Sequence, residues 1–298
     1  MQPIFVLVGP TASGKSGSAI PVAKELGAEI VSLDSMALYR GMDIGTDKPR
    51  DLHGVRHHLL DLLDPAERFD LARYLADADA AISGIRERNK RVLIVGGTGL
   101  YLMGLLKGVF GGAPRDPAFR ATLSGVAADT LHARLREVDE ATAARVHQND
   151  RRRIVRALEV HAVTGRPLSE LQTQFEGEDR YASVVAGVRR SRDDLRRRAR
   201  LRIDQMWAEG LVEEVRGLEL GDTAGQAVGY KEVAGFLAGE YDEGEAKRLV
   251  LRNTMRLIRR QGTWFKRFDV HWVDAGPTDD PAALCPKLIA IYRGDATP

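Results

Sequence analysis

The sequence predicts an α/β fold in which helices flank a parallel sheet and an all-helical domain is inserted. Three observations predict it. An apolar run at residues 4–8 reads as a buried strand and leads through a glycine-bounded loop into a helix. Further short apolar runs alternate with helical patterns, as in parallel sheets, at residues 29–33, 91–95, 183–188 and 270–273. No strand-like run interrupts the helical pattern from 113 to 180. We therefore expect a discontinuous core of residues 1–112 and 181–298, with 113–180 as the insertion.

The loop after the first strand fits the pattern G-x-x-x-x-G-K-[ST], which makes the core a P-loop core. A helix is expected from Lys15 to Leu26, and its first backbone N–H groups and its dipole would point into the loop. Such a concavity favours a pyrophosphate group. Lys15 would add a point charge, and Ser16 would supply an oxygen ligand to Mg²⁺. The predicted diphosphate-binding residues are Gly9, Thr11, Ala12, Ser13, Gly14, Lys15 and Ser16.

The second predicted strand, residues 29–33, delivers Asp34 to its carboxyl end. Ligands of open α/β sheets lie beyond these ends, so Asp34 should face the same crevice as the glycine-bounded loop. It is a candidate base or Mg²⁺ ligand, and the competing interpretation is an aspartate that caps a turn before Ser35. The turn-rich residues 40–49 are expected to form a loop over the crevice.

The third predicted strand, residues 91–95, ends in Gly96-Gly97-Thr98-Gly99-Leu100-Tyr101. Glycines there allow close backbone approach to a ligand, and Thr98 offers a hydroxyl group. A helix capped by Asp70 is predicted to supply the crossover before this strand. His57 and His58 are adjacent and should point to opposite sides of an extended segment, which argues against a shared metal.

Glycine and proline at residues 111–114 mark a linker, after which four helices are predicted. They span residues 117–123, 131–138, 141–147 and 149–164, and Gly165 ends the last one. After the strand at 183–188, Ser191 is expected to cap an arginine-rich helix that ends near Gly210. The chain is then largely helical to Trp264 and closes with the strand at 270–273.

The bulk composition is that of an ordinary globular protein, with 298 residues, 44% hydrophobic and 29% charged. No run approaches eighteen apolar residues, and the first strand begins without a charged leader. We therefore expect neither a membrane span nor a signal peptide, and a cytoplasmic protein. The single cysteine, Cys285, excludes an internal disulfide and a cysteine metal cage.

The net charge is only +2, but the basic residues are clustered. Residues 189–202 hold eight arginines against two aspartates, and residues 252–267 hold six Lys or Arg and no acid. A third cluster comprises Arg145, Arg151, Arg152, Arg153 and Arg156. One such stretch is often a solvated helix face, whereas three favour a polyanionic partner.

Several motifs, in this order along the chain, resemble those of tRNA dimethylallyltransferases. They are Gly9 to Ser16; Asp34-Ser35 with Tyr39 to Thr46 and Lys48-Pro49; His57-His58-Leu59; Gly96 to Tyr101; Asn149-Asp150 with Arg156 to Glu159; Gly229-Tyr230-Lys231-Glu232; and Thr263-Trp264-Phe265. Ala37 stands where many members of that family carry Gln, and Gly262 stands where a larger apolar residue is usual.

The resemblance implies transfer of a dimethylallyl group from dimethylallyl diphosphate to N6 of an adenosine beside the tRNA anticodon, usually position 37, with Mg²⁺. It implies Asp34 and Thr98 as catalytic residues, and the anticodon stem-loop as the bound part of the tRNA. Contacts with tRNA are implied at Asp34, Ser35, Met36, Ala37, Thr98, Arg120, Arg151, Arg152, Arg153, Ile154 and Val155. A monomer is the default expectation.

The chemistry agrees with this assignment because the leaving group would be a pyrophosphate, while adenine N6 is a poor nucleophile that needs a carboxylate to take its proton. Two other functions are compatible with the loop. A small-molecule or nucleotide kinase would bind ATP there, and Asp34 would hold Mg²⁺ or deprotonate a hydroxyl group. A nucleotide-dependent RNA-binding protein would perform no covalent chemistry.

Overall fold

The computed structural model describes residues 2–108, 114–171 and 178–295, and it divides into two compact units. One unit comprises Met1–Leu102 and Tyr181–Pro298, and the other comprises Met103–Arg180. The predicted boundary between 112 and 113 and most of the glycine-proline linker lie outside the described residues. The first boundary between the two units instead falls between Leu102 and Met103, within helix α3 (Gly99–Lys107).

The first unit contains a six-stranded parallel sheet in the order β3-β2-β4-β1-β5-β6. Its strands are β1 (Ile4–Val8), β2 (Ala28–Leu33), β3 (His57–His58), β4 (Arg91–Gly96), β5 (Ser183–Arg189) and β6 (His271–Asp274). All five predicted strands are confirmed, and β4 lies beside β1 in the sheet. The two histidines form the short edge strand β3.

Three strands of this sheet end at the same level. Gly96, the last residue of β4, lies opposite Val8 of β1 and Leu33 of β2. Because the strands are parallel, the segments that begin at Gly9, Asp34 and Gly97 leave the sheet together. This register brings three predicted site segments to one edge.

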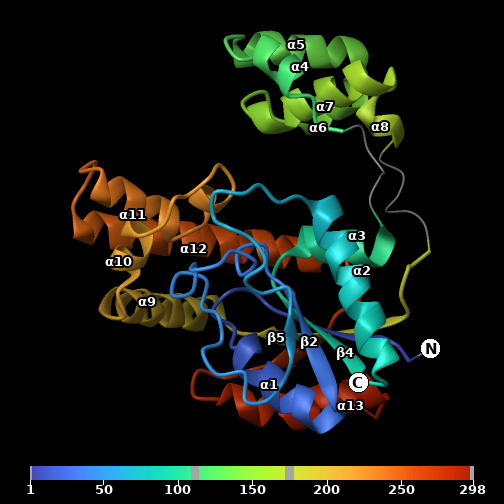
Figure 1. Cartoon of the computed structure of the whole chain (residues 1–298), viewed down its shortest axis with the longest axis vertical. Helices are drawn as coiled ribbons and strands as arrows, with labels where there is room; N and C mark the ends of the chain where they lie inside the picture. The colour runs from blue at the N-terminus through green and yellow to red at the C-terminus, as the bar shows by residue number, and fades with distance from the viewer. Residues whose placement is uncertain (1, 109–113, 172–177, 296–298) are drawn as a thin grey trace. The chain divides into compact units, whose positions relative to one another are not determined.

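The helices of this unit cover the sheet and extend beyond it. Helix α1 (Lys15–Leu26) lies beside α13 (Cys285–Arg293), and α2 (Leu71–Glu87) packs on β2 and β4 (Figure 1). The Asp70 carboxylate caps α2 by accepting the Arg73 N–H at 3.0 Å, as predicted. The apolar core between α1, α13 and the sheet includes Leu7, Val22 and Leu288, each no more than 1% exposed.

A group of helices, α9 to α12, follows β5, and Figure 1 shows them gathered beyond the sheet. They are α9 (Arg192–Ala208), α10 (Leu211–Arg216), α11 (Tyr230–Leu237) and α12 (Glu243–Phe265), with the short 3₁₀ helices η2 (Ala224–Gln226) and η3 (Pro281–Leu284). Ser191 caps α9 by accepting the Asp194 N–H at 3.2 Å, which confirms that prediction.

The second unit is helical and has its own core. It contains α4 (Pro117–Thr122), α5 (Ala128–Val138), α6 (Glu140–Arg145), α7 (Arg151–Thr164) and α8 (Leu168–Leu171). The four predicted helices are confirmed, with α7 starting two residues later because Asp150 is its cap. Leu131, Leu135 and Ile154 are fully buried between these helices. The unit therefore has the separate core that an inserted domain needs.

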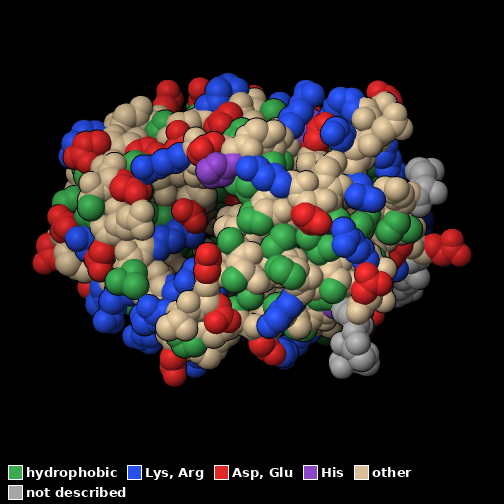
Figure 2. All heavy atoms as spheres, turned by 90° about the horizontal axis from the view of Figure 1, so that it is seen from below, with side chains coloured by type: hydrophobic (Ala, Val, Ile, Leu, Met, Phe, Trp, Pro, Cys, Tyr) green, Lys and Arg blue, Asp and Glu red, His purple; other side chains and the backbone are tan. Residues whose placement is uncertain are grey.

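Charges of both signs are interspersed over the face drawn in Figure 2. That pattern agrees with a net charge of only +2. Within the described ranges, no helix has the length and apolar character needed to cross a bilayer.

Candidate functional site

The strand ends bring Asp34 and Thr98 together. The Thr98 N–H donates to the Leu33 carbonyl at 3.2 Å, and the Ser35 N–H donates to Thr98 Oγ1 at 3.4 Å. Asp34 Oδ1 accepts the Met36 N–H at 2.9 Å, so this carboxylate does cap a turn. Asp34 Oδ2 has no hydrogen bond to any residue that the structure describes. The two interpretations of Asp34 are therefore compatible, because one oxygen fixes the turn and the other stays available.

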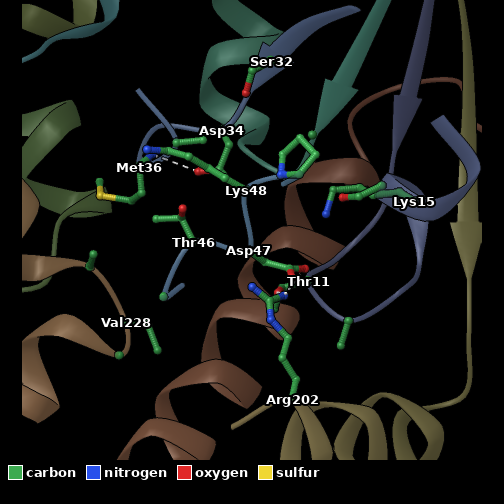
Figure 3. A pocket seen from close by; sticks show the side chains of 18 of the residues that line it. Thr11, Lys15, Ser32, Asp34, Met36, Thr46, Asp47, Lys48, Arg202 and Val228 are labelled. Atoms are coloured by element: carbon green, nitrogen blue, oxygen red, sulfur yellow. Dashed lines mark hydrogen bonds and ion pairs between the residues drawn. The ribbon is translucent and has the colours of Figure 1, made fainter. Parts of the chain in front are cut away.

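A cavity lies at this edge of the sheet, and Asp34 and Lys15 both line it (Figure 3). The first unit supplies its walls from the phosphate loop with α1, the ends of β2 and β4, the segment after β2 through β3, helix α9, the residues after η2, and α12. Apolar side chains and a few polar groups share the lining, which is typical of small-molecule sites. The polar residues are Thr11, Lys15, Ser16, Ser32, Asp34, Thr46, Asp47, Lys48, His57, Arg202, Thr254 and Gln261.

The phosphate loop contributes only part of its predicted set to the cavity lining. Thr11, Ala12, Lys15 and Ser16 line the cavity, whereas Gly9, Ser13 and Gly14 do not. The Ser13 side chain is buried inside the loop, where its Oγ accepts the Lys15 N–H at 3.4 Å. Ser13 therefore supports the loop from within, and a diphosphate would meet Lys15 and Ser16 first.

Arginines of the α9 region hold the phosphate loop from outside. Arg190 Nε donates to the Ser13 carbonyl at 2.7 Å, and Arg198 Nε donates to the Ala12 carbonyl at 2.8 Å. The Arg190 side chain is completely buried and also donates to Asp194 at 3.0 Å. These hydrogen bonds occupy two carbonyl oxygens that would otherwise repel a bound anion. Arg190 and Arg198, which belong to the predicted polyanion-binding cluster, therefore stabilise the phosphate loop.

Gln261 of α12 joins the phosphate loop to the segment after β4. Its Oε1 accepts the Thr11 N–H at 2.9 Å. A Cβ at Gly97 would lie 2.3 Å from Gln261 Nε2, so glycine is required there for the close approach. The N–H of Thr11 is therefore already engaged, and Thr11 could bind a diphosphate through its hydroxyl group.

The Lys15 ammonium group lies in a field of mixed charges. Burial lowers its pKa from the ordinary value of 10.5, and Arg202 adds to that effect, while Asp34 and Asp47 oppose it. The negative charges of Asp34 and Asp47 therefore do not fully balance the positive charge of Lys15 in the protein itself. A bound diphosphate would supply the missing negative charge.

Arg202 of α9 is a site residue that motif analysis did not single out within its cluster. Figure 3 shows its guanidinium group directed toward Thr11 and Asp47. Nη1 donates to Thr11 Oγ1 at 3.1 Å and lies 3.3 Å from Asp47 Oδ2. Its Nε is buried and has no hydrogen-bond partner in the described part of the chain. An unsatisfied cationic donor beside Lys15 makes this end of the cavity suited to an anion.

The residues that resemblance assigns to tRNA contact in the second unit have unequal exposure. Arg152 and Arg153 are exposed on the first turn of α7. Arg151 is instead engaged within the unit and donates to the carbonyls of Val126, at 2.5 Å, and Leu123. Ile154 and Val155 are buried in the unit's core. Because these two side chains are enclosed, an RNA contact at Ile154 or Val155 would have to come from the backbone, and it stays a prediction.

Arg120 forms an ion pair with the fully buried Glu159. Its Nε and Nη2 donate to the two carboxylate oxygens at 2.6 and 2.7 Å, and Arg156 donates to the same group at 2.7 Å. Burial alone would raise the pKa of Glu159, but these hydrogen bonds and the Asp116 N–H outweigh it and hold the pKa at about 2. A tRNA contact by Arg120 stays a prediction, and any test of it needs a stability control.

Arg120→Ala is expected to lower the free energy of unfolding of the helical unit by roughly 2–4 kcal/mol, because Glu159 loses its bidentate partner in the core. The double variant Arg120→Ala/Glu159→Gln should recover part of that loss. Glu159 has a lower pKa when folded than when unfolded, so its contribution to stability is present above pH 4.5 and is lost as the pH falls toward 2. Urea unfolding of both variants from pH 7 to pH 3 measures this, and equal stabilities of wild type and Arg120→Ala would contradict it.

Two family models match the chain. The model described as IPP transferase matches residues 37–268, and the model described as Isopentenyl transferase matches residues 2–62. The first match spans most of the chain, including the segment after β4, helix α9 and all of α12.

Several known sequences and solved structures are similar to the chain over nearly its whole length. The chain is 46% identical over 284 residues to a tRNA dimethylallyltransferase of Geobacter sulfurreducens, with 91% of each chain covered. It is 46% identical over 303 residues to a tRNA dimethylallyltransferase of Symbiobacterium thermophilum, covering 98% of this chain and 95% of that one. The crystal structure of a tRNA isopentenylpyrophosphate transferase from Bacillus halodurans aligns with a TM-score of 0.72 and 34% identity, covering 99% of this chain and 98% of that one.

Proposed function

The chain belongs to the IPP transferase family, and from that premise we propose that it transfers a dimethylallyl group from dimethylallyl diphosphate to N6 of an adenosine in tRNA, expected at position 37. The observation that carries the proposal is a cavity lined by the cations Lys15 and Arg202 and by the Asp34 carboxylate. The cations suit a diphosphate leaving group. The carboxylate suits an acceptor that must lose a proton.

The diphosphate end of the reaction is assigned to the phosphate loop, Lys15 and Arg202. As the bond between C1 of the dimethylallyl group and the bridging oxygen breaks, its electron pair passes to the diphosphate. Fixed positive charges at that place stabilise the growing negative charge more than they stabilise the bound substrate. Thr98 would donate a hydrogen bond to the departing bridging oxygen.

Mg²⁺ is proposed as the cofactor, with Ser16 as its protein ligand. Ser16 is exposed at the start of α1 and lines the cavity. Among the described residues, no group of three His, Cys, Asp or Glu side chains could hold a metal. This donor set fits Mg²⁺, which commonly takes few protein ligands and several substrate phosphate oxygens. When bound, the ion would neutralise diphosphate charge.

The acceptor end of the reaction is assigned to Asp34. The N6 lone pair is delocalised into the purine, so attack on C1 becomes favourable only as the N6 proton leaves. Asp34 Oδ2 would accept that proton while Oδ1 keeps its hydrogen bond to the Met36 N–H. Atoms and electrons balance: an N–C bond forms, a C–O bond breaks, and the proton moves to the carboxylate.

The remaining lining of the cavity suits a short hydrocarbon chain. Apolar side chains of α9 and α12 line it, including Ile203, Met206, Val250 and Leu257. A five-carbon group would be shielded from water there, which prevents hydrolysis of a reactive allylic centre. The adenosine must leave its stack in the anticodon loop to reach this cavity, at a cost of a few kcal/mol.

We expect Arg152 and Arg153 to offset that cost through phosphate contacts. The double variant Arg152→Ala/Arg153→Ala should weaken tRNA binding and reduce the slope of log Kd against log salt by about 1 to 2. The matched control is Arg134→Ala/Arg136→Ala, which removes the same charge from exposed positions of α5. Filter binding at several salt concentrations measures the slopes. An unchanged slope in the first variant would remove these arginines from the tRNA-binding surface.

The direct test of the function is mass spectrometry of nucleosides from unmodified tRNA incubated with the protein, Mg²⁺ and dimethylallyl diphosphate, without ATP. The expected product is N6-dimethylallyladenosine. Phosphate transfer from ATP, with no C5 transfer, would instead favour the kinase. We further propose that the protein acts as a cytoplasmic monomer, for which size-exclusion chromatography with light scattering is the measurement of mass.

A further inference from the structure

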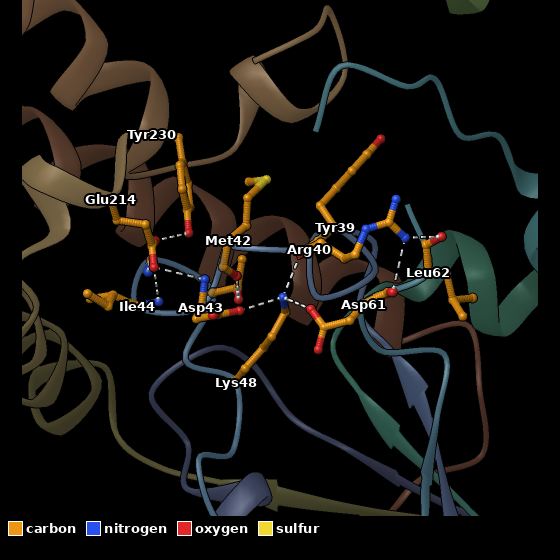
Figure 4. A network of polar contacts seen from close by, with 12 residues as sticks. Tyr39, Arg40, Met42, Asp43, Ile44, Lys48, Asp61, Leu62, Glu214 and Tyr230 are labelled. Atoms are coloured by element: carbon orange, nitrogen blue, oxygen red, sulfur yellow. Dashed lines mark hydrogen bonds and ion pairs between the residues drawn. The ribbon is translucent and has the colours of Figure 1, made fainter. Parts of the chain in front are cut away.

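The loop at residues 43–49 forms one wall of the cavity, and two groups outside the catalytic set fix its shape. Residues Gly45 to Pro49 line the cavity. Asp47 lies 3.3 Å from Arg202, so the loop reaches the cation proposed to bind diphosphate. A displacement of this loop would therefore move the partner of Arg202. Figure 4 shows the contacts that hold it.

The first of these groups is the Glu214 carboxylate of α10. It accepts the N–H groups of three consecutive loop residues, Asp43 at 3.0 Å, Ile44 at 2.8 Å and Gly45 at 3.3 Å. Three successive backbone donors that converge on one anion form a concave site of the kind usually filled by a ligand. Here the chain fills that site with its own carboxylate, which fixes the turn at the start of the loop.

The second group is Tyr230, at the first position of α11. Its side chain is fully buried, and its hydroxyl donates to Glu214 Oε1 at 2.5 Å. The Tyr230 ring lies against Gly45 so closely that a Cβ there would be 2.3 Å from Cε2. Burial and the neighbouring carboxylate raise the pKa of Tyr230, so the hydroxyl keeps its proton and remains a donor.

Lys48 holds the loop at its other end. The Lys48 side chain is only 6% exposed, and its Nζ donates to the Tyr39 carbonyl at 2.5 Å, to Asp43 at 2.7 Å and to Asp61 at 2.6 Å. The intervening Asp47 has a left-handed backbone with φ of 58°. A non-glycine residue in this region persists where its surroundings hold it. The loop is thus fixed on both sides of Asp47.

We propose that Glu214 and Tyr230 are positioning residues that hold the 43–49 loop so that Asp47 orients Arg202 toward the diphosphate. They touch neither substrate, and they act through Gly45, Asp47 and Arg202 in turn. The inference rests on the proposed function for its kinetic readout, because it assigns a diphosphate to the cavity. The structural part of the inference is that Glu214 fixes the backbone N–H groups of the loop, and this part does not depend on the proposed function.

The test compares Glu214→Ala with Glu213→Ala, its neighbour on α10, whose side chain is 69% exposed and contacts Arg216. Glu214→Ala is expected to raise KM for dimethylallyl diphosphate about 10- to 100-fold and to leave the Kd for tRNA within about twofold. Tyr230→Phe keeps the ring against Gly45 and removes only the hydroxyl, so its KM should rise about 2- to 5-fold. Glu213→Ala should match the wild type.

Two further measurements keep the proposal falsifiable without turnover. Hydrogen exchange of peptides covering residues 43–49 should quicken in Glu214→Ala and stay at the wild-type rate in Glu213→Ala. The Kd for inorganic pyrophosphate, measured calorimetrically with Mg²⁺, should rise in parallel with KM. If Glu214→Ala fails to fold, Tyr230→Phe carries both measurements.

Unchanged exchange and unchanged pyrophosphate affinity in these variants would overturn the proposal. An equal loss of pyrophosphate affinity in Glu213→Ala would overturn it as well. The effect would then come from a general change in helix α10 and not from the contacts of Glu214 with the loop. If the wild type modifies no tRNA but the exchange and pyrophosphate results are as expected, the proposed function fails and the positioning role stands.

Discussion

Asp34→Asn is expected to lower kcat for dimethylallyl transfer about 100- to 10,000-fold while the Kd for tRNA stays within about twofold. The asparagine side chain has the same shape and keeps an oxygen for the Met36 N–H, so the turn after β2 should survive. It cannot accept the N6 proton. Single-turnover kinetics with saturating tRNA and dimethylallyl diphosphate isolates this step from product release.

The control for this prediction is Asp269→Asn, which removes the same charge at an exposed position before β6. It should keep wild-type kinetics. A fall in tRNA affinity as large as the fall in kcat would show that Asp34 binds the substrate and is not its base. Full turnover in Asp34→Asn would assign the N6 proton to a different base. RNA binding with no dimethylallyl transfer, in the wild type as in the variant, would favour the RNA-binding alternative.

The sequence was sufficient to predict the sheet and the segments at its edge. Parallel strands are buried on both faces, so β1, β2 and β4 appear as short apolar runs whose ends can be counted. Once those ends are known, parallel topology brings Gly9, Asp34 and Gly97 to one edge, as the register confirms. Local rules also placed the caps at Asp70 and Ser191, because a cap depends only on neighbouring residues.

The residues that complete the site could not be predicted from the same signals. Arg202, Gln261 and Glu214 come from helices far along the chain, and their roles depend on which helix face meets the phosphate loop. Thr11 and Gln261 are 250 positions apart, yet they share a hydrogen bond. Helical periodicity shows that a face exists, but tertiary packing decides what that face contacts.

The arginine clusters illustrate the limit of composition as a signal. Their number predicts a polyanionic partner, and Arg152 and Arg153 are exposed as that requires. Arg190, however, is buried against Ser13 and Asp194, and Arg120 neutralises Glu159. A count of charges cannot separate guanidinium groups that support the fold from those that face solvent.

Lys15→Met is expected to reduce kcat/KM for dimethylallyl diphosphate about 100- to 1,000-fold, because it removes a half-buried positive charge that lines the cavity where the leaving group would bind. The methionine keeps an apolar stem of similar length. Burial lowers the pKa of Lys15, and a lysine with a lowered folded pKa costs stability wherever the unfolded lysine is charged, that is, below pH 10.5. The variant should therefore have an equal or higher Tm at pH 7.

The lowered pKa of Lys15 also predicts how the affinity for pyrophosphate depends on pH. The Lys15 ammonium binds an anion only while it is protonated, so the wild-type affinity for pyrophosphate should fall as the pH rises through its lowered pKa. Pyrophosphate favours the protonated form, so binding in that pH range should take up a proton. Calorimetry in two buffers of different ionisation enthalpy measures that uptake, which should vanish in Lys15→Met. A lower Tm together with unchanged proton uptake in Lys15→Met would show that Lys15 stabilises the fold and does not bind the leaving group. A lysine that only supports the loop has no reason to gain a proton when an anion binds.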